Sequence, residues 1–241
     1  MFLKKFRSNA IYLSICFLAI YIQTRNSTQL ETVWDNFYYL FYGVSSTGFS
    51  LYTYIFFNIV FLGSPFLNQH YFYATVNGEF YYLLIRFQSF NNWFKQLFKE
   101  IIIGSSLIII ILFAYTFLFS LLWNLKIENS FTVENNGTIN ILIYHYFING
   151  FLQMINYNLI LLIVVCSTKK IEYVLLSSGI LLILGLPNFN LQTLFPVALN
   201  SFGYMTLNFS DTIQITITLT FYIVIEIIII QYLLNKRIII S

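Results

Sequence analysis

Few side chains in this sequence have the chemistry for catalysis or transport, and the most unusual of them is Glu226. It lies between isoleucines near the middle of the apolar run Ile213–Leu234. An ionised side chain at the centre of a membrane helix costs about 3 kcal/mol on insertion scales. It is tolerated where it is protonated, paired or hydrated. We expect Glu226 either to have a functional role or to form a structural hydrogen bond with a neighbouring helix.

Three amide side chains form a second candidate group. Asn149, Gln153 and Asn156 follow the i, i+4, i+7 spacing that places residues on one face of a helix. Amide groups facing lipid would lack hydrogen-bond partners, so we expect this face to turn toward other helices. Together with Glu226, these three residues are the candidate polar sites inside the membrane.

His145 and Asn149 have an HxxxN spacing that a membrane-embedded glutamate protease could use. Such an enzyme also needs a clustered pair of carboxylates to activate water, and the predicted crossings contain only Glu226. No rhomboid-like serine site is evident. We therefore predict no catalytic residues, and we expect His145 to be satisfied by a hydrogen bond.

The sequence also lacks the common cofactor and metal motifs. It has no GxxxxGK[ST] nucleotide-binding loop and no HExxH zinc motif. His70 and His145 lie in different segments, so a metal centre has too few ligands. Cys16 and Cys166 lie in apolar runs, as small apolar residues do, and form no spaced framework. We therefore predict that the protein has no cofactor, no metal and no ATPase site of its own, and that it is not an enzyme.

The composition is that of a membrane protein. Of the 241 residues, 59% are hydrophobic and only 9% are charged, and the mean hydropathy is +0.76. Soluble domains have about 25% charged residues, so this chain cannot cover a globule with polar surface. The net charge of +3 is too small for a nucleic-acid-binding protein. We expect the lipid bilayer to be its solvent.

The apolar runs predict an all-α polytopic protein with six crossings in one transmembrane domain, residues 1–241. The fifth run would be only about 21 Å long as a helix, so it either includes residues after Pro187 or stops partway through the bilayer. The second is rich in Gly, Ser and Thr, which predicts a closely packed helix interface. The predicted crossings are residues 10–23, 37–62, 101–123, 139–166, 173–186 and 213–234.

The basic residues predict the orientation of these crossings, because Lys and Arg are retained on the cytoplasmic side. With the N-terminus inside, ten basic residues lie in inner segments and two, Arg25 and Lys126, in outer ones. We therefore predict a multi-pass protein of the cell membrane with both termini in the cytoplasm. The ten inner residues are Lys4, Lys5, Arg7, Arg86, Lys95, Lys99, Lys169, Lys170, Lys236 and Arg237.

Residues 63–100 form the one long cytoplasmic segment, and its second half is amphipathic. The apolar residues there follow helical spacing, and Trp93 beside them suits the headgroup level. Such a helix lies in the membrane surface, either as an anchor alone or as a docking element for a partner. The apolar stripe consists of Phe80, Leu83, Leu84, Phe87, Phe90, Phe94, Leu97 and Phe98. The candidate docking residues are Arg86, Asn92, Lys95 and Lys99.

The outer segment 187–211 combines Pro and Gly with many apolar residues. A solvated loop does not need such apolar content. We therefore predict short re-entrant or membrane-lying helices here, covered by other parts of the protein.

This layout resembles the membrane subunit of ABC-2-type ABC transporters. The stretch Val76–Phe87, continuing through Asn92–Gln96, is similar to the segment before the third crossing in small permease-like proteins of Gram-positive bacteria. Some of these accompany bacteriocin or lantibiotic export and self-immunity loci. The resemblance implies a separate ATPase subunit that contacts residues 78–99, and a second permease subunit in a homodimer or heterodimer. It favours a peptide substrate.

Two other classes stay open on the sequence alone. The overuse of Asn, Tyr, Phe and Ile also fits a divergent, organelle-encoded membrane subunit of a respiratory complex. The third possibility is a membrane immunity protein that binds a toxin and transports nothing. An ATPase gene beside this one would favour transport, and neighbouring oxidoreductase genes would favour the respiratory subunit.

Overall fold

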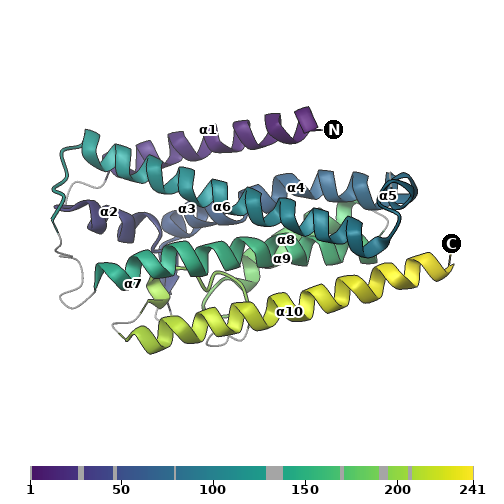
Figure 1. The fold of residues 1–241 in the computed structure, drawn as a ribbon. Helices are drawn as coiled ribbons and strands as arrows, with labels where there is room; N and C mark the ends of the chain where they lie inside the picture. Colours follow the sequence, from purple (N-terminus) through teal and green to yellow (C-terminus); the bar gives the residue numbers. More distant parts are fainter. Residues whose placement is uncertain are drawn as a thin grey trace.

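The computed structural model describes residues 2–26, 30–45, 48–78, 80–128, 138–168, 171–189, 195–205 and 208–240. It is an elongated bundle of helices (Figure 1). The α-helices are α1 (Phe2–Asn26), α2 (Val33–Leu40), α3 (Leu51–Phe61), α4 (Gly63–Tyr73), α5 (Phe80–Phe87), α6 (Phe90–Leu122), α7 (Ile139–Tyr144), α8 (Gly150–Ser167), α9 (Ile171–Leu184) and α10 (Phe209–Ile240).

Five short elements complete the described part of the fold. Two are π-helical turns, η1 (Ala74–Gly78) and η2 (His145–Asn149), and η4 (Phe202–Tyr204) is a 3₁₀ turn. The strands β1 (Val44–Ser45) and β2 (Gly48–Phe49) form an antiparallel hairpin in which Val44 pairs with Phe49.

Three helical stretches of the described residues are long and apolar enough to cross a membrane: Asn91–Leu122, Ile139–Ser167 and Phe209–Asn235. A fourth is added if Leu51–Phe61 and Gly63–Val76, which meet at a bend of 40°, count as one broken span. The prediction of a helical membrane protein is confirmed at this level. Of the other predicted crossings, 10–23 lies within α1 and 173–186 corresponds to α9, but their apolar cores of about 21 Å are short for a bilayer.

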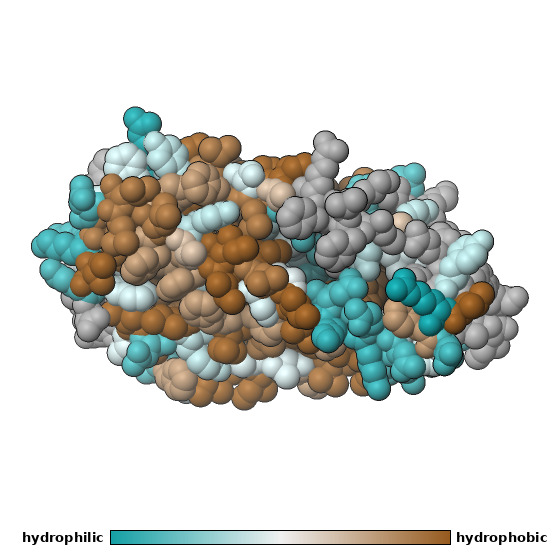
Figure 2. Space-filling model, turned by 45° about the horizontal axis from the view of Figure 1, so that its top comes forward, coloured by the Kyte–Doolittle hydropathy of each residue, from teal (hydrophilic) through white to brown (hydrophobic). Residues whose placement is uncertain are grey.

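The bundle has a central helix and outer helices. The apolar window of the α7–α8 span is 67% buried, against 33% for the α6 span and 28% for the α10 span. Large apolar side chains such as Leu107, Ile217 and Phe221 stay exposed on the outer helices. Figure 2 shows apolar side chains gathered over the middle of one face, with hydrophilic groups toward both ends. This is the pattern of a surface that meets lipid.

Both termini lie at one end of the bundle, the end at which α5 also lies (Figure 1). The C-terminal end of α6 and the N-terminal end of α7 lie at the opposite end. The side of the membrane that each end faces stays a prediction. Lys169 and Lys170, counted above among the inner residues, lie outside the described residues.

The predicted crossing 37–62 is not one helix. α2 ends at Leu40, and Gly43 then takes a φ of +59°, which a right-handed helix excludes. The β1–β2 hairpin follows, and a new helix begins only at Leu51. The apolar content of the run gave no sign of this break, because an apolar residue packs equally well in a helix and in a covered turn.

The predicted cytoplasmic segment 63–100 also differs from a separate surface helix. Its first part, α4, continues the broken span of α3. Its amphipathic part is divided at Gln88, where φ is 59°, and Ser89 caps the first turn of α6 by accepting from the backbone N–H of Asn92 at 3.2 Å. α6 therefore begins at Phe90 and runs without interruption through the predicted third crossing.

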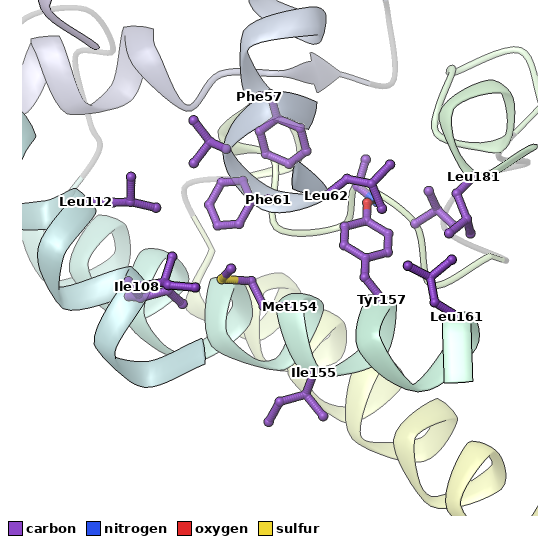
Figure 3. Close-up of a cluster of buried hydrophobic side chains, with 14 of the residues drawn as sticks. Phe57, Phe61, Leu62, Ile108, Leu112, Met154, Ile155, Tyr157, Leu161 and Leu181 are labelled. Atoms are coloured by element: carbon purple, nitrogen blue, oxygen red, sulfur yellow. The ribbon is translucent and has the colours of Figure 1, made fainter. Parts of the chain in front are cut away.

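On α6, the stripe residues Phe94 and Leu97 are buried against the bundle, and so is Trp93 beside them. The position of Trp93 at the headgroup level stays a prediction. The core continues through rings and aliphatic side chains of α3, α6 and α8, among which Phe57, Phe61 and Met154 point toward one another in Figure 3.

Candidate functional site: a buried polar seam

The central span carries a line of four polar residues on one face, which we name the polar seam: His145, Asn149, Gln153 and Asn156. All four side chains are fully buried. The amide spacing predicted one face for the last three, and the structure places them on a common line with His145. Each seam residue contacts a segment distant in sequence, so the seam holds the surrounding elements in place.

His145 and Asn149 begin the seam inside the π-helical turn η2. Asn149 Nδ2 lies 2.8 Å from His145 Nδ1, which accepts because the amide nitrogen is a donor only. His145 Nε2 therefore carries the ring hydrogen and donates to the Ser201 carbonyl oxygen at 3.2 Å. The expectation that His145 is satisfied by hydrogen bonds is confirmed.

Asn149 also joins the central span to α10. Its Nδ2 donates to the Thr212 carbonyl oxygen at 3.2 Å, and its Oδ1 accepts from Thr216 Oγ1 at 2.6 Å. The same threonine hydroxyl lies 3.1 Å from the hydroxyl of Tyr144. Thr216 was not singled out from the sequence, since a threonine in an apolar helix usually bonds its own backbone.

Gln153 holds a non-helical segment deep in the protein. We name residues 195–205 the re-entrant segment. Gln153 Nε2 donates to the Pro196 carbonyl oxygen at 2.7 Å, and its Oε1 accepts from the Leu199 N–H at 3.1 Å. One turn further, the Tyr157 hydroxyl accepts from the N–H of Ala198 at 2.9 Å. Ala198 has a φ of 57°, an uncommon conformation that these bonds help to hold.

The re-entrant segment meets the break between α2 and α3, so two non-helical stretches lie side by side. The backbone N–H groups of Phe202 and Gly203 donate to the carbonyl oxygens of Phe41 and Tyr42, each at 3.0 Å. Ser201 Oγ accepts from the Val44 N–H at 2.7 Å and lies within hydrogen-bond reach of the carbonyl oxygens of Tyr42 and Val44. Other parts of the protein therefore satisfy the polar backbone groups of both stretches, which is the condition for non-helical backbone within a membrane.

The predicted outer re-entrant segment 187–211 is thus partly described. Residues 195–205 are covered by protein, as predicted, although they contain only one short 3₁₀ turn, η4. Residues 190–194 and 206–207 lie outside the described residues. The sequence gave no sign that this segment would pair with residues 41–44, because such a contact joins stretches about 160 positions apart.

The last member of the seam contacts Glu226. Asn156 Nδ2 donates to Glu226 Oε1 at 3.0 Å, and the carboxylate residue is only 5% exposed. Asn156 and Glu226 each lie about one turn beyond the midpoint of their spans. Of the four intramembrane candidates, the structure thus pairs Asn156 with Glu226, while Asn149 and Gln153 lie on the same helix face as Asn156 and bond other segments.

The four docking candidates lie elsewhere. Arg86 on α5 and Asn92, Lys95 and Lys99 on α6 are all exposed. Tyr82 and Ile85 are exposed beside Arg86, at 77% and 78%. We name these six residues the α5–α6 surface. Among the described residues, the ion pair found is Lys126–Glu128, at 3.8 Å, so no carboxylate described here neutralises these three cations.

The described residues contain no group of three His, Cys, Asp or Glu side chains that could hold a metal ion. Comparison of the chain with protein-family models, with curated proteins and with solved structures gives no match. Any functional interpretation therefore depends on the seam, the re-entrant segment and the α5–α6 surface.

Proposed function

We propose that this chain is the membrane-spanning subunit of an ABC-2-type transporter, which works with a separate ATPase subunit. The observation that carries the proposal is the α5–α6 surface. It combines exposed apolar groups with cations and lies at the same end of the bundle as both termini (Figure 1). A surface of this kind suits a protein partner with an acidic groove.

The continuity of α6 supports the proposal mechanically. This helix has 33 residues and would be about 50 Å long, whereas a bilayer core needs about 20 residues. Asn92, Lys95 and Lys99 lie in its first three turns. Force applied to the α5–α6 surface would therefore tilt a rigid helix that continues across the membrane.

The element that such a tilt would move is the re-entrant segment. α6 packs on α8, which holds the re-entrant segment through Gln153 and Tyr157. Closure of two ATPase subunits on ATP would favour one arrangement of these elements, by differential binding to two conformations. The path itself would lie between this chain and a second permease subunit. A bacteriocin-like peptide, exported or extracted for self-protection, is the proposed substrate class.

The test is affinity purification in mild detergent, followed by identification of the bound proteins. We expect an ABC ATPase to co-purify with the wild-type chain. Arg86→Glu combined with Lys95→Glu should reduce the recovered ATPase at least several-fold, because a charge reversal at a docking surface weakens binding by a few kcal/mol.

Lys126→Glu is the matched control. Lys126 is an exposed cation that follows the C-terminal end of α6, and that end of α6 lies away from α5, so the charge reversal should leave the recovered ATPase unchanged. Membrane insertion of all three chains should be equal. An ATPase recovered equally with the double variant would contradict docking at this surface, and the absence of any ATPase from the wild-type sample would contradict the proposed function.

A further inference from the structure

The contact between Asn156 and Glu226 is incomplete in a specific way. Asn156 Nδ2 donates to Glu226 Oε1, which uses one polar atom of each side chain. The other two atoms, Asn156 Oδ1 and Glu226 Oε2, are buried, and no described group donates to either. Both are oxygens, so they cannot bond to each other unless a hydrogen is added between them.

No cation among the described residues offers an alternative partner. The span packed against α10 contributes Tyr144, His145, Tyr146, Tyr157 and Cys166 as its titratable side chains. None of them is hydrogen-bonded to Glu226, and His145 is already bonded to Asn149 and Ser201. On α10 itself, the titratable described side chains are Asp211, Tyr222 and Tyr232, of which none forms an ion pair with Glu226.

We propose that Asn156 and Glu226 form a proton-binding site. Glu226 holds a proton on Oε2 and donates it to Asn156 Oδ1, while Asn156 Nδ2 donates to Glu226 Oε1. One proton thereby satisfies both unpartnered oxygens and closes a cyclic acid–amide pair with two hydrogen bonds. The pair joins α8 to α10 inside the membrane without a buried charge.

The protonated pair holds α8 and α10 together. Loss of the proton leaves an anion that keeps one hydrogen bond and has no cation beside it among the described side chains, so a deprotonated Glu226 requires water. Water reaches this position only if α8 and α10 separate. Proton release and separation of the two helices are therefore coupled. The proton site is independent of any ATPase partner.

A glutamine at position 226 is the neutral mimic of the protonated acid, because its amide group also donates one hydrogen bond and accepts another. Infrared spectroscopy of the protein in lipid at neutral pH detects the difference directly. The difference spectrum, obtained by subtracting the spectrum of Glu226→Gln from that of the wild type, should contain the carbonyl stretch of a protonated carboxylic acid. The control difference, wild type minus Glu172→Gln, removes an exposed carboxylate and should contain the bands of an ionised one.

The exchange of the two groups tests the pairing. Asn156→Asp combined with Glu226→Gln preserves both side-chain lengths and reverses the acid and the amide. We expect this double variant to retain the protonated-acid band and to melt at the wild-type temperature. Asn156→Asp alone places two carboxyl groups together and should melt lower at alkaline pH.

The pH dependence of stability gives a second readout. If the folded state holds this proton, stability falls as the pH rises, since the unfolded chain releases the proton more readily. Glu226→Gln should therefore match the wild type only near about pH 4, where the carboxyl group of the unfolded chain is also protonated, and should melt progressively higher than the wild type as the pH rises. Ionised-carboxylate bands in the wild type minus Glu226→Gln spectrum would overturn the proposal. So would identical pH–melting curves for the two proteins.

Discussion

Gly203 lies where two distant segments of the chain approach each other closely. A Cβ atom added there would lie 2.2 Å from the Val44 carbonyl oxygen, a distance that real Cβ atoms do not reach. The opposing Gly43 combines positive φ with a Cβ position 2.8 Å from Ser201 Oγ. The contact between the re-entrant segment and residues 41–45 thus depends on two glycines.

Gly203→Ala should therefore break this contact. The added methyl group must push apart two backbones, and the donors of Phe202 and Gly203 would be left unpartnered, at about 1–3 kcal/mol each. We expect a fall in melting temperature and loss of transport. Thermal unfolding in detergent measures the first effect.

Gly104→Ala is the control for this change. Nothing lies within 4 Å of a Cβ added at Gly104, in the interior of α6, so the variant should gain about 1 kcal/mol from helix propensity. If Gly203→Ala were as stable as Gly104→Ala, the close approach of the two backbones would be incorrect.

The polar residues show which features of the site could be predicted from the sequence alone. Helical spacing placed Asn149, Gln153 and Asn156 on one face, and the cost of polar groups in lipid required that face to turn inward. The partner of Gln153 is a backbone segment about 43–46 positions away, and the partner of Asn156 is 70 positions away. Periodicity contains no information on such pairs, because they depend on how the helices pack.

Among the helices, the junction between α5 and α6 decides how a force applied to the α5–α6 surface would be transmitted to the part of α6 that crosses the membrane. Gln88 has a φ of 59°, and Ser89 begins the next helix with its side chain as the N-cap. Sequence periodicity predicted one helix over this region, because the apolar stripe continues across the junction. The cap signal of a single Ser before Phe90 was too weak to indicate the break.

Gln88→Gly should stabilise the protein or leave it unchanged. A non-glycine residue in the left-handed region costs about 1 kcal/mol, which glycine avoids. The matched change Gln96→Gly, at an exposed position inside α6, should instead destabilise by about 1 kcal/mol. Melting curves of the two variants that shift downward equally would show an uninterrupted helix at Gln88.

At the scale of the whole molecule, the composition and the long apolar runs were enough to predict a helical membrane protein. They were not enough to find its breaks. The run 37–62 has the length of a crossing, yet Gly43 and the hairpin divide it into two helices. Conversely, the C-terminal part of the predicted cytoplasmic segment 63–100, which contains several polar residues, belongs to the long helix α6.

We propose that the α5–α6 surface faces the cytoplasm, where an ATPase can reach it. Single cysteines at Asn92 and at Ile127 test it, in a chain whose buried Cys16 and Cys166 are replaced by Ser. Both positions are exposed, and they lie near opposite ends of the bundle (Figure 1).

The measurement is labelling of each cysteine by a membrane-impermeant maleimide, before and after the cells are permeabilised. We predict that Ile127→Cys is labelled in intact cells and that Asn92→Cys is labelled only after permeabilisation. Labelling of Asn92→Cys in intact cells would place the α5–α6 surface outside the cell and contradict the account.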